Sequence, residues 1–236
     1  MKLRSIVTAG LLGTSLLTVT GCWLEDEVKD KIEEALKTNV IHLANGRTSQ
    51  VEFTIDDDSE LVGSETSKMV VVTGHDTYTV NNTAVDHEAT FAKDKAHLYA
   101  LCVDDNVLTD TSTTGARQIE VMNLSGTPID AGSGKTVTVT LYNSTDELIA
   151  SASLEGQILA ACSRETLPFP DFALSAVKTV EVNDVNYTVP PYDEDIAAKL
   201  DQLNDVDFDI VVFDPTPGSE KGTIVPLATA VELAID

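Results

Sequence analysis

The sequence predicts an all-β protein built mainly from antiparallel β-sandwiches. From residue 39 onward, short runs rich in Val, Ile, Thr and Tyr alternate between apolar and polar residues. Turn-prone residues separate these runs, and few helical patterns interrupt them. Hydrophobic residues make up 42% of the chain, which is enough to form a packed core. Many short strands joined by turns are typical of antiparallel sandwiches.

The first residues have the pattern of an export signal. Lys2 and Arg4 give a positive start, an uncharged apolar run covers residues 6–19, and small residues precede Cys22. The apolar run, about 14 residues long, is shorter than the roughly 20 residues that a transmembrane helix needs. We therefore expect residues 1–21 to be a signal peptide that is removed.

The stretch Val19-Thr20-Gly21-Cys22 resembles the lipobox of bacterial lipoproteins. The resemblance implies that the thiol of Cys22 is diacylated, that the signal is cut before it, and that the new amino group is acylated. Several acyl chains anchor a protein stably in a membrane. In Gram-negative lipoproteins an aspartate after the cysteine commonly causes retention at the inner membrane. Trp23 stands there instead, which implies the outer membrane, on its periplasmic face or at the cell surface. An ordinary signal with a chance cysteine is the alternative.

Acidic side chains greatly outnumber basic ones, at 39 against 15, and the net charge is −24. Without Lys2 and Arg4, 13 basic groups remain against 39 acidic ones, which gives −26 for the rest of the chain. Such a balance argues against nucleic acid as a partner, because phosphate binding requires clustered Lys and Arg. The expected partners are the membrane, through the lipid anchor, and an unidentified envelope or extracellular protein.

The predicted elements follow in order along the chain. Residues 22–38 are expected to form a lipidated tether with a short helix at 25–37, because Val28, Ile32, Ala35 and Leu36 fall on one face. Residues 39–103 are expected to form a first Ig-like sandwich, residues 104–116 a polar linker, and residues 117–236 a second sandwich. Pro190, Pro191 and Asp193 predict one extra helix in the second sandwich. The expected strands cover 39–44, 50–56, 69–72, 77–80, 97–103, 118–123, 136–142, 148–153, 157–162, 177–182, 186–189, 206–213 and 228–235.

The two halves contain a weak internal repeat. Residues 40–45 (VIHLAN) match 119–123 (IEVMN), residues 74–80 (GHDTYTV) match 183–189 (NDVNYTV), and each half continues to a strongly alternating strand. These patterns resemble the tandem β-sandwich module of bacterial envelope lipoproteins called domain of unknown function 4397. The resemblance covers roughly 39–103 and, less closely, 118–213, and it departs from that family's usual S-P-D turn. That family has no established activity, so the resemblance implies no catalytic residue.

Cys102 and Cys162 remain as a pair once Cys22 is assigned to the anchor. Each closes an apolar strand, in different halves of the chain. An even pair in an exported protein permits a disulfide, which would join the two halves. Two buried free thiols are the alternative.

The many carboxylates make calcium the one cofactor worth considering. Asp56 and Asp58, and likewise Asp104 and Asp105, follow strands, where sandwich loops can build cation sites. The alternating Asp205, Asp207 and Asp209 look like a D-x-D-x-D motif, but Ile210 and Thr216 stand where an EF-hand requires glycine and glutamate. We expect these three to line a solvated strand face. A solvated surface is the competing interpretation of the two loop clusters as well, with no cofactor bound.

No complete catalytic motif occurs in the sequence. The stretch Gly132-Ser133-Gly134-Lys135-Thr136 mimics a phosphate-binding loop, but Ile129 replaces the first glycine and a strand pattern follows. We therefore expect a lipid-anchored, non-catalytic envelope protein with a binding or structural role. A calcium-stabilised adhesion or binding module is the first alternative. A hydrolase assembled from distant Ser, His and Asp residues is the second.

Overall fold

The computed structural model describes residues 38–73, 76–92, 95–112, 118–170, 172–188, 199–200, 202, 206–219 and 221–229. The expected signal peptide, Cys22, Trp23 and the tether helix lie outside the described residues. The helix expected after Pro191 falls largely outside them too, although Lys199 and Leu200 have helical geometry. Among the residues described, no helix is both long and apolar enough to span a bilayer.

The first sandwich consists of two four-stranded sheets with the strand orders β4-β1-β7-β8 and β3-β2-β5-β6. All neighbouring strands are antiparallel except β1 and β7, which run parallel. The strands are β1 (Thr38–Asn45), β2 (Val51–Ile55), β3 (Asp58–Val62), β4 (Thr66–Thr73), β5 (Thr77–Asn82), β6 (Ala89–Ala92), β7 (Ala96–Leu101) and β8 (Val107–Thr111).

The second sandwich has sheets in the orders β14-β9-β17-β18 and β12-β11-β15-β16, with a small β10-β13 sheet beside them. Here β9 and β17 are the parallel pair. The elements are β9 (Ile119–Asn123), β10 (Ile129–Asp130), β11 (Thr138–Tyr142), β12 (Leu148–Ser153), β13 (Ile158–Leu159), β14 (Ser163–Thr166), the 3₁₀ helix η1 (Leu174–Ala176), β15 (Thr179–Val182), β16 (Val185–Thr188), β17 (Asp207–Val212) and β18 (Gly222–Leu227). The all-β fold class predicted from the sequence is therefore confirmed.

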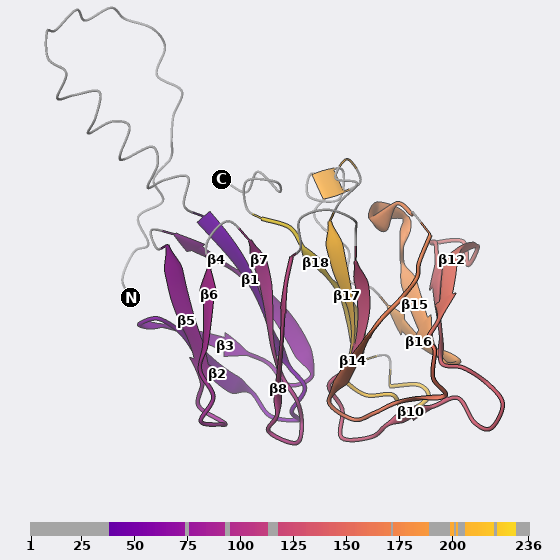
Figure 1. Ribbon diagram of the computed structural model, residues 1–236, viewed down its shortest axis with the longest axis horizontal. Coiled ribbons are helices and arrows are strands. Elements are labelled where there is room, and N and C mark those ends of the chain that lie inside the picture. Colours follow the sequence, from indigo (N-terminus) through magenta and orange to yellow (C-terminus); the bar gives the residue numbers. More distant parts are fainter. Residues whose placement is uncertain are drawn as a thin grey trace, which may run out of the picture.

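The two sandwiches stand side by side, and the four main sheets form a stack (Figure 1). The two inner sheets, which contain β1 and β7 on one side and β17 and β18 on the other, pack face to face. Every residue of β7 and of β17 is buried. A strand between two layers has no solvated side, so both of its faces need partners. We call the contact between the two inner sheets the seam.

The strand order shows that one unit occurs twice. In each copy the inner sheet contains the first strand beside a later, parallel strand, flanked by an antiparallel edge strand on each side. The same buried asparagine ends the first strand of each copy. Asn45 Nδ2 donates to the carbonyls of Ser49 and Gly63, at 2.8 and 2.7 Å. Asn123 Nδ2 donates to those of Thr127 and Ala160, at 2.8 and 3.1 Å. Each asparagine thereby ties its own loop to a second one.

The second part of the predicted repeat is wrong by one strand. Tyr78 lies on β5, the neighbour of β2, whereas Tyr187 lies on β16, at the edge of its sheet. In the common strand order, β5 corresponds to β15 rather than to β16. The two tyrosines share a sequence pattern because both fill a sandwich core, and each is 1% exposed.

The expected linker at 104–116 is the main error in the predicted domain boundaries. Val107–Thr111 forms β8, which pairs with β7 and completes the inner sheet of the first sandwich. Its five residues are all half-buried, so the segment shows no apolar alternation. Most of the expected strand at 228–235 lies outside the described residues. Its two described residues, Ala228 and Thr229, have no strand geometry, and they directly follow β18 at Gly222–Leu227, which was not predicted.

Candidate functional site: the seam between the sandwiches

Alternation along the inner strands decides which side chains enter the seam. On β7, His97, Tyr99 and Leu101 point into the first sandwich, so Ala96, Leu98 and Ala100 point toward the second. These three, with Val40 and Ala44 of β1, belong to the same buried cluster as the core of the second sandwich. Small alanines let the two sheets approach closely.

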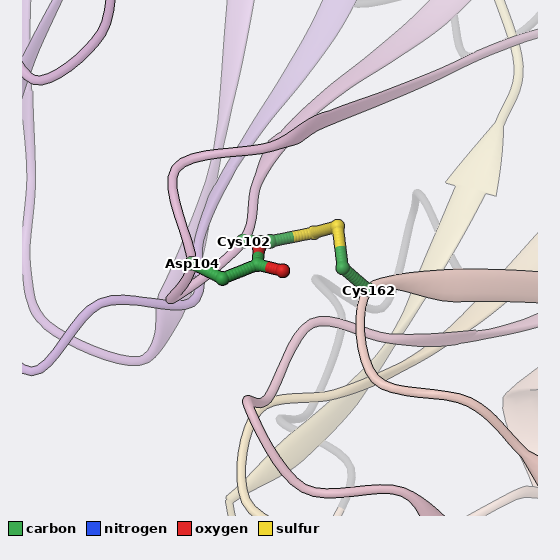
Figure 2. A group of neighbouring side chains, drawn as sticks. All are labelled: Cys102, Asp104 and Cys162. Carbon is green, nitrogen blue, oxygen red and sulfur yellow. A yellow bond between two sulfur atoms is a disulfide. The ribbon is translucent and has the colours of Figure 1, made fainter.

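A disulfide joins the two sandwiches at one end of the seam. It links Cys102, which directly follows β7, to Cys162, which precedes β14 (Figure 2). The two Cα atoms are 5.7 Å apart, and the bridge closes a sequence separation of 60 residues. Asp104 lies beside the two sulfur atoms, and one oxygen of its carboxylate is within 4.8 Å of both. Because both sulfurs are engaged in the bond, they are not available as metal-binding thiolates.

Backbone contacts hold the same end of the seam. Val103 N–H donates to the Leu124 carbonyl at 3.0 Å, and Gly46 N–H donates to the Leu101 carbonyl at 2.7 Å. A Cβ on Gly46 would lie 2.8 Å from the Leu124 oxygen and 2.9 Å from the Leu124 Cβ. Glycine is therefore required where the loop after β1 presses on the loop after β9.

Three carboxylates from both sandwiches meet farther along the seam. Asp110 comes from β8 of the first sandwich, whereas Glu120 of β9 and Asp209 of β17 lie next to each other on parallel strands of the second. One carboxylate oxygen of each lies within 4.8 Å of the other two. We call these three residues the seam carboxylates.

Arg164 of β14 is the cation that faces the seam carboxylates. Its Nη1 lies 3.0 Å from Asp110 Oδ1 and 3.3 Å from Glu120 Oε2, and it donates to the Thr109 carbonyl at 2.9 Å. The side chains of Asp110, Glu120 and Arg164 remain 21%, 13% and 40% exposed. The cluster is therefore open to solvent on the side of Arg164, and it is closed at Asp209, which is 1% exposed.

The pKa values of two of the seam carboxylates, Asp209 and Glu120, are raised. Burial raises the pKa of Asp209 well above its ordinary value, and the neighbouring carboxylates of Asp110 and Glu120 raise it further. Burial also raises the pKa of Glu120, with Asp110 adding to the rise and the Arg164 guanidinium opposing it. The nearby Asp207 is satisfied differently, because its Oδ1 accepts a hydrogen bond from Gln118 N–H at 2.6 Å.

His42 is the polar side chain at the equivalent place in the first sandwich. It lies on β1, is 5% exposed, and hydrogen-bonds the backbone of Pro226 in β18 of the other sandwich. Since proline offers only a carbonyl, the imidazole donates. Burial lowers the pKa of His42 to about 4, and the hydrogen bond to Pro226 only partly opposes this. His42 is therefore neutral at pH 7.

The structure corrects the expectation for Asp207 and Asp209. Phe208, Ile210 and Val212 of β17 point into the core of the second sandwich, but the opposite face, which carries the aspartates, is not solvated as expected. Both aspartates are buried, at 3% and 1% exposure, because the first sandwich covers that face. Asp205 lies outside the described residues.

The two loop clusters considered for calcium are separated. Asp56 follows the strand β2 in a turn at one end of the first sandwich, and its Oδ1 accepts hydrogen bonds from Thr79 N–H and Oγ1 at 2.8 and 3.1 Å. Asp58 begins β3 beside it and is exposed. Asp104 and Asp105 follow β7 at the other end, where Asp105 pairs with Arg47 and Asp104 accepts from Asn106 Nδ2 at 3.0 Å. Within the described part of the chain, neither loop gathers three acidic or histidine ligand atoms within 4.8 Å.

The glycine-rich stretch at 132–136 lies in a loop before β11, as the sequence predicts. Together with Asp130, Glu181, Asn183 and Asp184, it lines an open depression on the outer part of the second sandwich. The strand that follows leaves no helix N-terminus to bind phosphate.

Sequence reasoning missed Asp110, Glu120 and Arg164 as members of a site. Asp110 lies in the stretch interpreted as a linker, and Glu120 is the polar member of an ordinary alternating strand. Only the Asp207–Asp209 alternation gave a signal, and the contact that makes it buried comes from the other sandwich.

Comparisons with known proteins add no family assignment. No protein-family model matches the chain, and no curated protein matches it significantly.

Proposed function

We propose that this chain is a lipid-anchored protein of the bacterial cell envelope, with a non-catalytic binding or structural role. In this proposal the acylated Cys22 holds the protein at the outer membrane, and the two sandwiches act as one rigid body outside the lipid. The observation that carries the proposal is the lipobox-like stretch that ends at Cys22, directly after a signal-like run.

The disulfide supports export. Disulfides form and persist in the periplasm and outside the cell, whereas cytosolic thiols are kept reduced. Cys102 and Cys162 are in bonding geometry and join the two copies of the repeated unit. A bridge of this kind suits a protein that leaves the cytosol.

The seam supports a single rigid body. Tandem domains that meet through small polar contacts usually move relative to each other. Here the inner sheets share a buried apolar cluster, a disulfide and the backbone hydrogen bond from Val103 to Leu124. Such a body can hold a binding surface at a fixed distance and angle from the membrane. The resemblance of the two units to the envelope-lipoprotein module favours the same role.

The test is fractionation of cells that express the chain or its Cys22→Ser variant. We expect the unaltered protein in the outer-membrane fraction and the variant in the soluble fraction, because the acyl chains supply the membrane affinity. Trp23→Asp serves as a matched control that keeps the cysteine, and we expect it to remain membrane-bound but to move toward the inner membrane. Membrane association of Cys22→Ser equal to that of the unaltered chain would contradict the proposal.

A further inference from the structure

We infer that the seam carboxylates Asp110, Glu120 and Asp209 form a calcium site that bridges the two sandwiches. This site differs from the two loop clusters that the sequence suggested. It does not depend on the lipid anchor, so the proposed function and this site can fail separately.

The spacing of the three oxygens suits calcium. Oxygens bound to one Ca²⁺ lie about 2.3–2.6 Å from the ion, so two of them can be at most about 4.6–5.2 Å apart. One oxygen from each seam carboxylate lies within 4.8 Å of the others. Mg²⁺ holds its ligands at about 2.0–2.1 Å and requires a more compact octahedron. The spacing is compatible with Ca²⁺, whose flexible coordination accepts three carboxylates together with water more readily than the rigid octahedron of Mg²⁺ does.

One buried oxygen of Asp209 points to a missing ligand. Asp209 Oδ2 is buried and has no hydrogen-bond donor among the groups that the structure describes. The side chain lies within hydrogen-bonding reach of Asp110, but that group is a second carboxyl and supplies no positive charge. A buried carboxylate oxygen without a donor is costly, and a bound cation is one way to satisfy it. Glu120 Oε2, on the neighbouring strand, is buried as well, and its contact is the ion pair with Arg164 at 3.3 Å.

The charge of the cluster fits a divalent ion. Three ionised carboxylates against the single Arg164 guanidinium leave two negative charges in a largely buried place. One Ca²⁺ would neutralise them. Asp110 and Glu120 are partly exposed, so an ion and its remaining water ligands can enter from that side.

Comparison of the two copies shows that the fold itself does not need this acid. Asn45 and Asn123 end equivalent strands, β1 and β9. Three residues before them lie His42 and Glu120, which are therefore equivalent. Their partners on the neighbouring parallel strands, Leu98 and Asp209, are equivalent as well. The first copy fills the position of Asp209 with an apolar residue in the same architecture. The second copy keeps a buried carboxylate there, next to two others.

The test measures binding of calcium itself to the purified protein at pH 7. After removal of ions with a chelator, we expect equilibrium dialysis against millimolar ⁴⁵Ca²⁺ to show one ion bound per chain. We expect 10 mM CaCl₂ to raise the melting temperature by roughly 3–10 °C, for a dissociation constant of roughly 0.1–1 mM. The same concentration of MgCl₂ should raise it much less.

The decisive variant is Asp209→Asn, which has nearly the shape of a protonated aspartate and so should fold. We expect it to lose the bound ion and the calcium-dependent rise, and Glu120→Gln to do the same. Asp58→Asn and Asp104→Asn are matched controls, because they remove single carboxylates from the two loop clusters, and we expect both to bind calcium like the unaltered chain. Absence of calcium binding by the unaltered protein, or binding that survives Asp209→Asn, would overturn the inference.

Discussion

The two sandwiches have one strand order but fill it with different chemistry. The first packs a chain of ring contacts in its core, with neighbouring centroids 4.6–6.5 Å apart: Tyr78 and Phe91 contact His97, and Phe91 continues to Tyr99 and Phe53. The second has a mainly aliphatic core. The features that they share are the parallel pair of inner strands and the asparagine that ends the first strand.

The faces that the two copies present to the seam differ more than their cores do. The first copy contributes small apolar residues with the neutral His42, and the second contributes Glu120, Asp207 and Asp209. Each copy places its polar group against an edge strand of the other copy. His42 of the first copy contacts Pro226 of β18, and Asp209 of the second copy contacts Asp110 of β8. The strands β8 and β18 have the same position in the two inner sheets. The comparison teaches that the topology fixes where the seam forms, whereas the residues on each face decide what it can bind.

Removal of the disulfide should have the largest effect on the association of the two copies. For the double variant Cys102→Ser, Cys162→Ser we expect the free energy of unfolding to fall by about 4 kcal/mol, because a loop of 60 residues is no longer closed in the unfolded chain. Urea unfolding measures this loss. Reductant should lower the free energy of unfolding of the unaltered protein to that of the double variant, and it should leave the double variant unchanged. Equal stability of both proteins under oxidising conditions would show that the bridge does not hold the copies together.

Acid should weaken the seam through His42. The pKa of His42 is about 4 in the folded protein against an ordinary value of 6.5, so the unfolded chain binds the extra proton first. The contribution of neutral His42 to the free energy of unfolding is fully present above about pH 6.5. It is lost as the pH falls toward 4, by about 3 kcal/mol in total.

The measurement compares urea unfolding of the unaltered protein and of His42→Leu from pH 7 to pH 4. Other groups titrate in both proteins, so the difference between the two curves isolates His42. The unaltered protein should lose about 3 kcal/mol more than the variant across this range. Parallel curves would mean that the imidazole is not buried in the seam.

A methyl group at Gly46 should disturb the place where the two loops touch. Gly46→Ala would bring a Cβ to 2.8 Å from the Leu124 oxygen and 3.0 Å from the Leu101 oxygen, both backbone atoms that cannot turn away. We expect a loss of about 2 kcal/mol in the free energy of unfolding, measured in urea. Gly156→Ala is the control, because its Cβ would meet no atom closer than 3.7 Å, and it should change stability very little. Equal behaviour of the two variants would argue against a close approach at Gly46.

The smallest effect is expected at the outer rim of the seam. Lys221, before β18, pairs with Glu65 of the first sandwich, but the lysine side chain is 45% exposed. Exposed ion pairs contribute little, because water screens them and ordering two long side chains costs entropy. Lys221→Gln should therefore leave the midpoint of thermal unfolding unchanged within error. A clear drop in the midpoint would show that contacts at the exposed rim, and not only those in the buried centre, stabilise the seam.

The sequence predicted the inner strands well and the edge strands poorly. The inner strands β1, β7, β9 and β17 are rich in apolar residues, so their alternation was visible. No predicted strand overlaps β3, β6, β8, β10, β14 or β18. All of these lie at sheet edges, and several carry polar sequences such as DSELV and SRET. An edge strand pairs on one side only and is half-solvated, so it needs little apolar pattern.

The seam and its carboxylates were not predictable for a related reason. Local alternation shows which residues share a strand face, but it does not show which other element covers that face. Asp209 therefore looked like part of a solvated face, although a second sandwich lies over it. The pairing of Cys102 with Cys162 was the one sequence feature that pointed to contact between the halves.

The intact mass of the mature protein, extracted from its native membrane and alkylated with and without reductant, tests the central claim most directly. We predict a chain that begins at Cys22 and carries the mass of lipoprotein acyl chains. Cys102 and Cys162 should take up the alkylating reagent only after reduction. A chain without acyl mass at Cys22, or one whose two other cysteines react freely before reduction, would contradict the account of an anchored body built from two joined sandwiches.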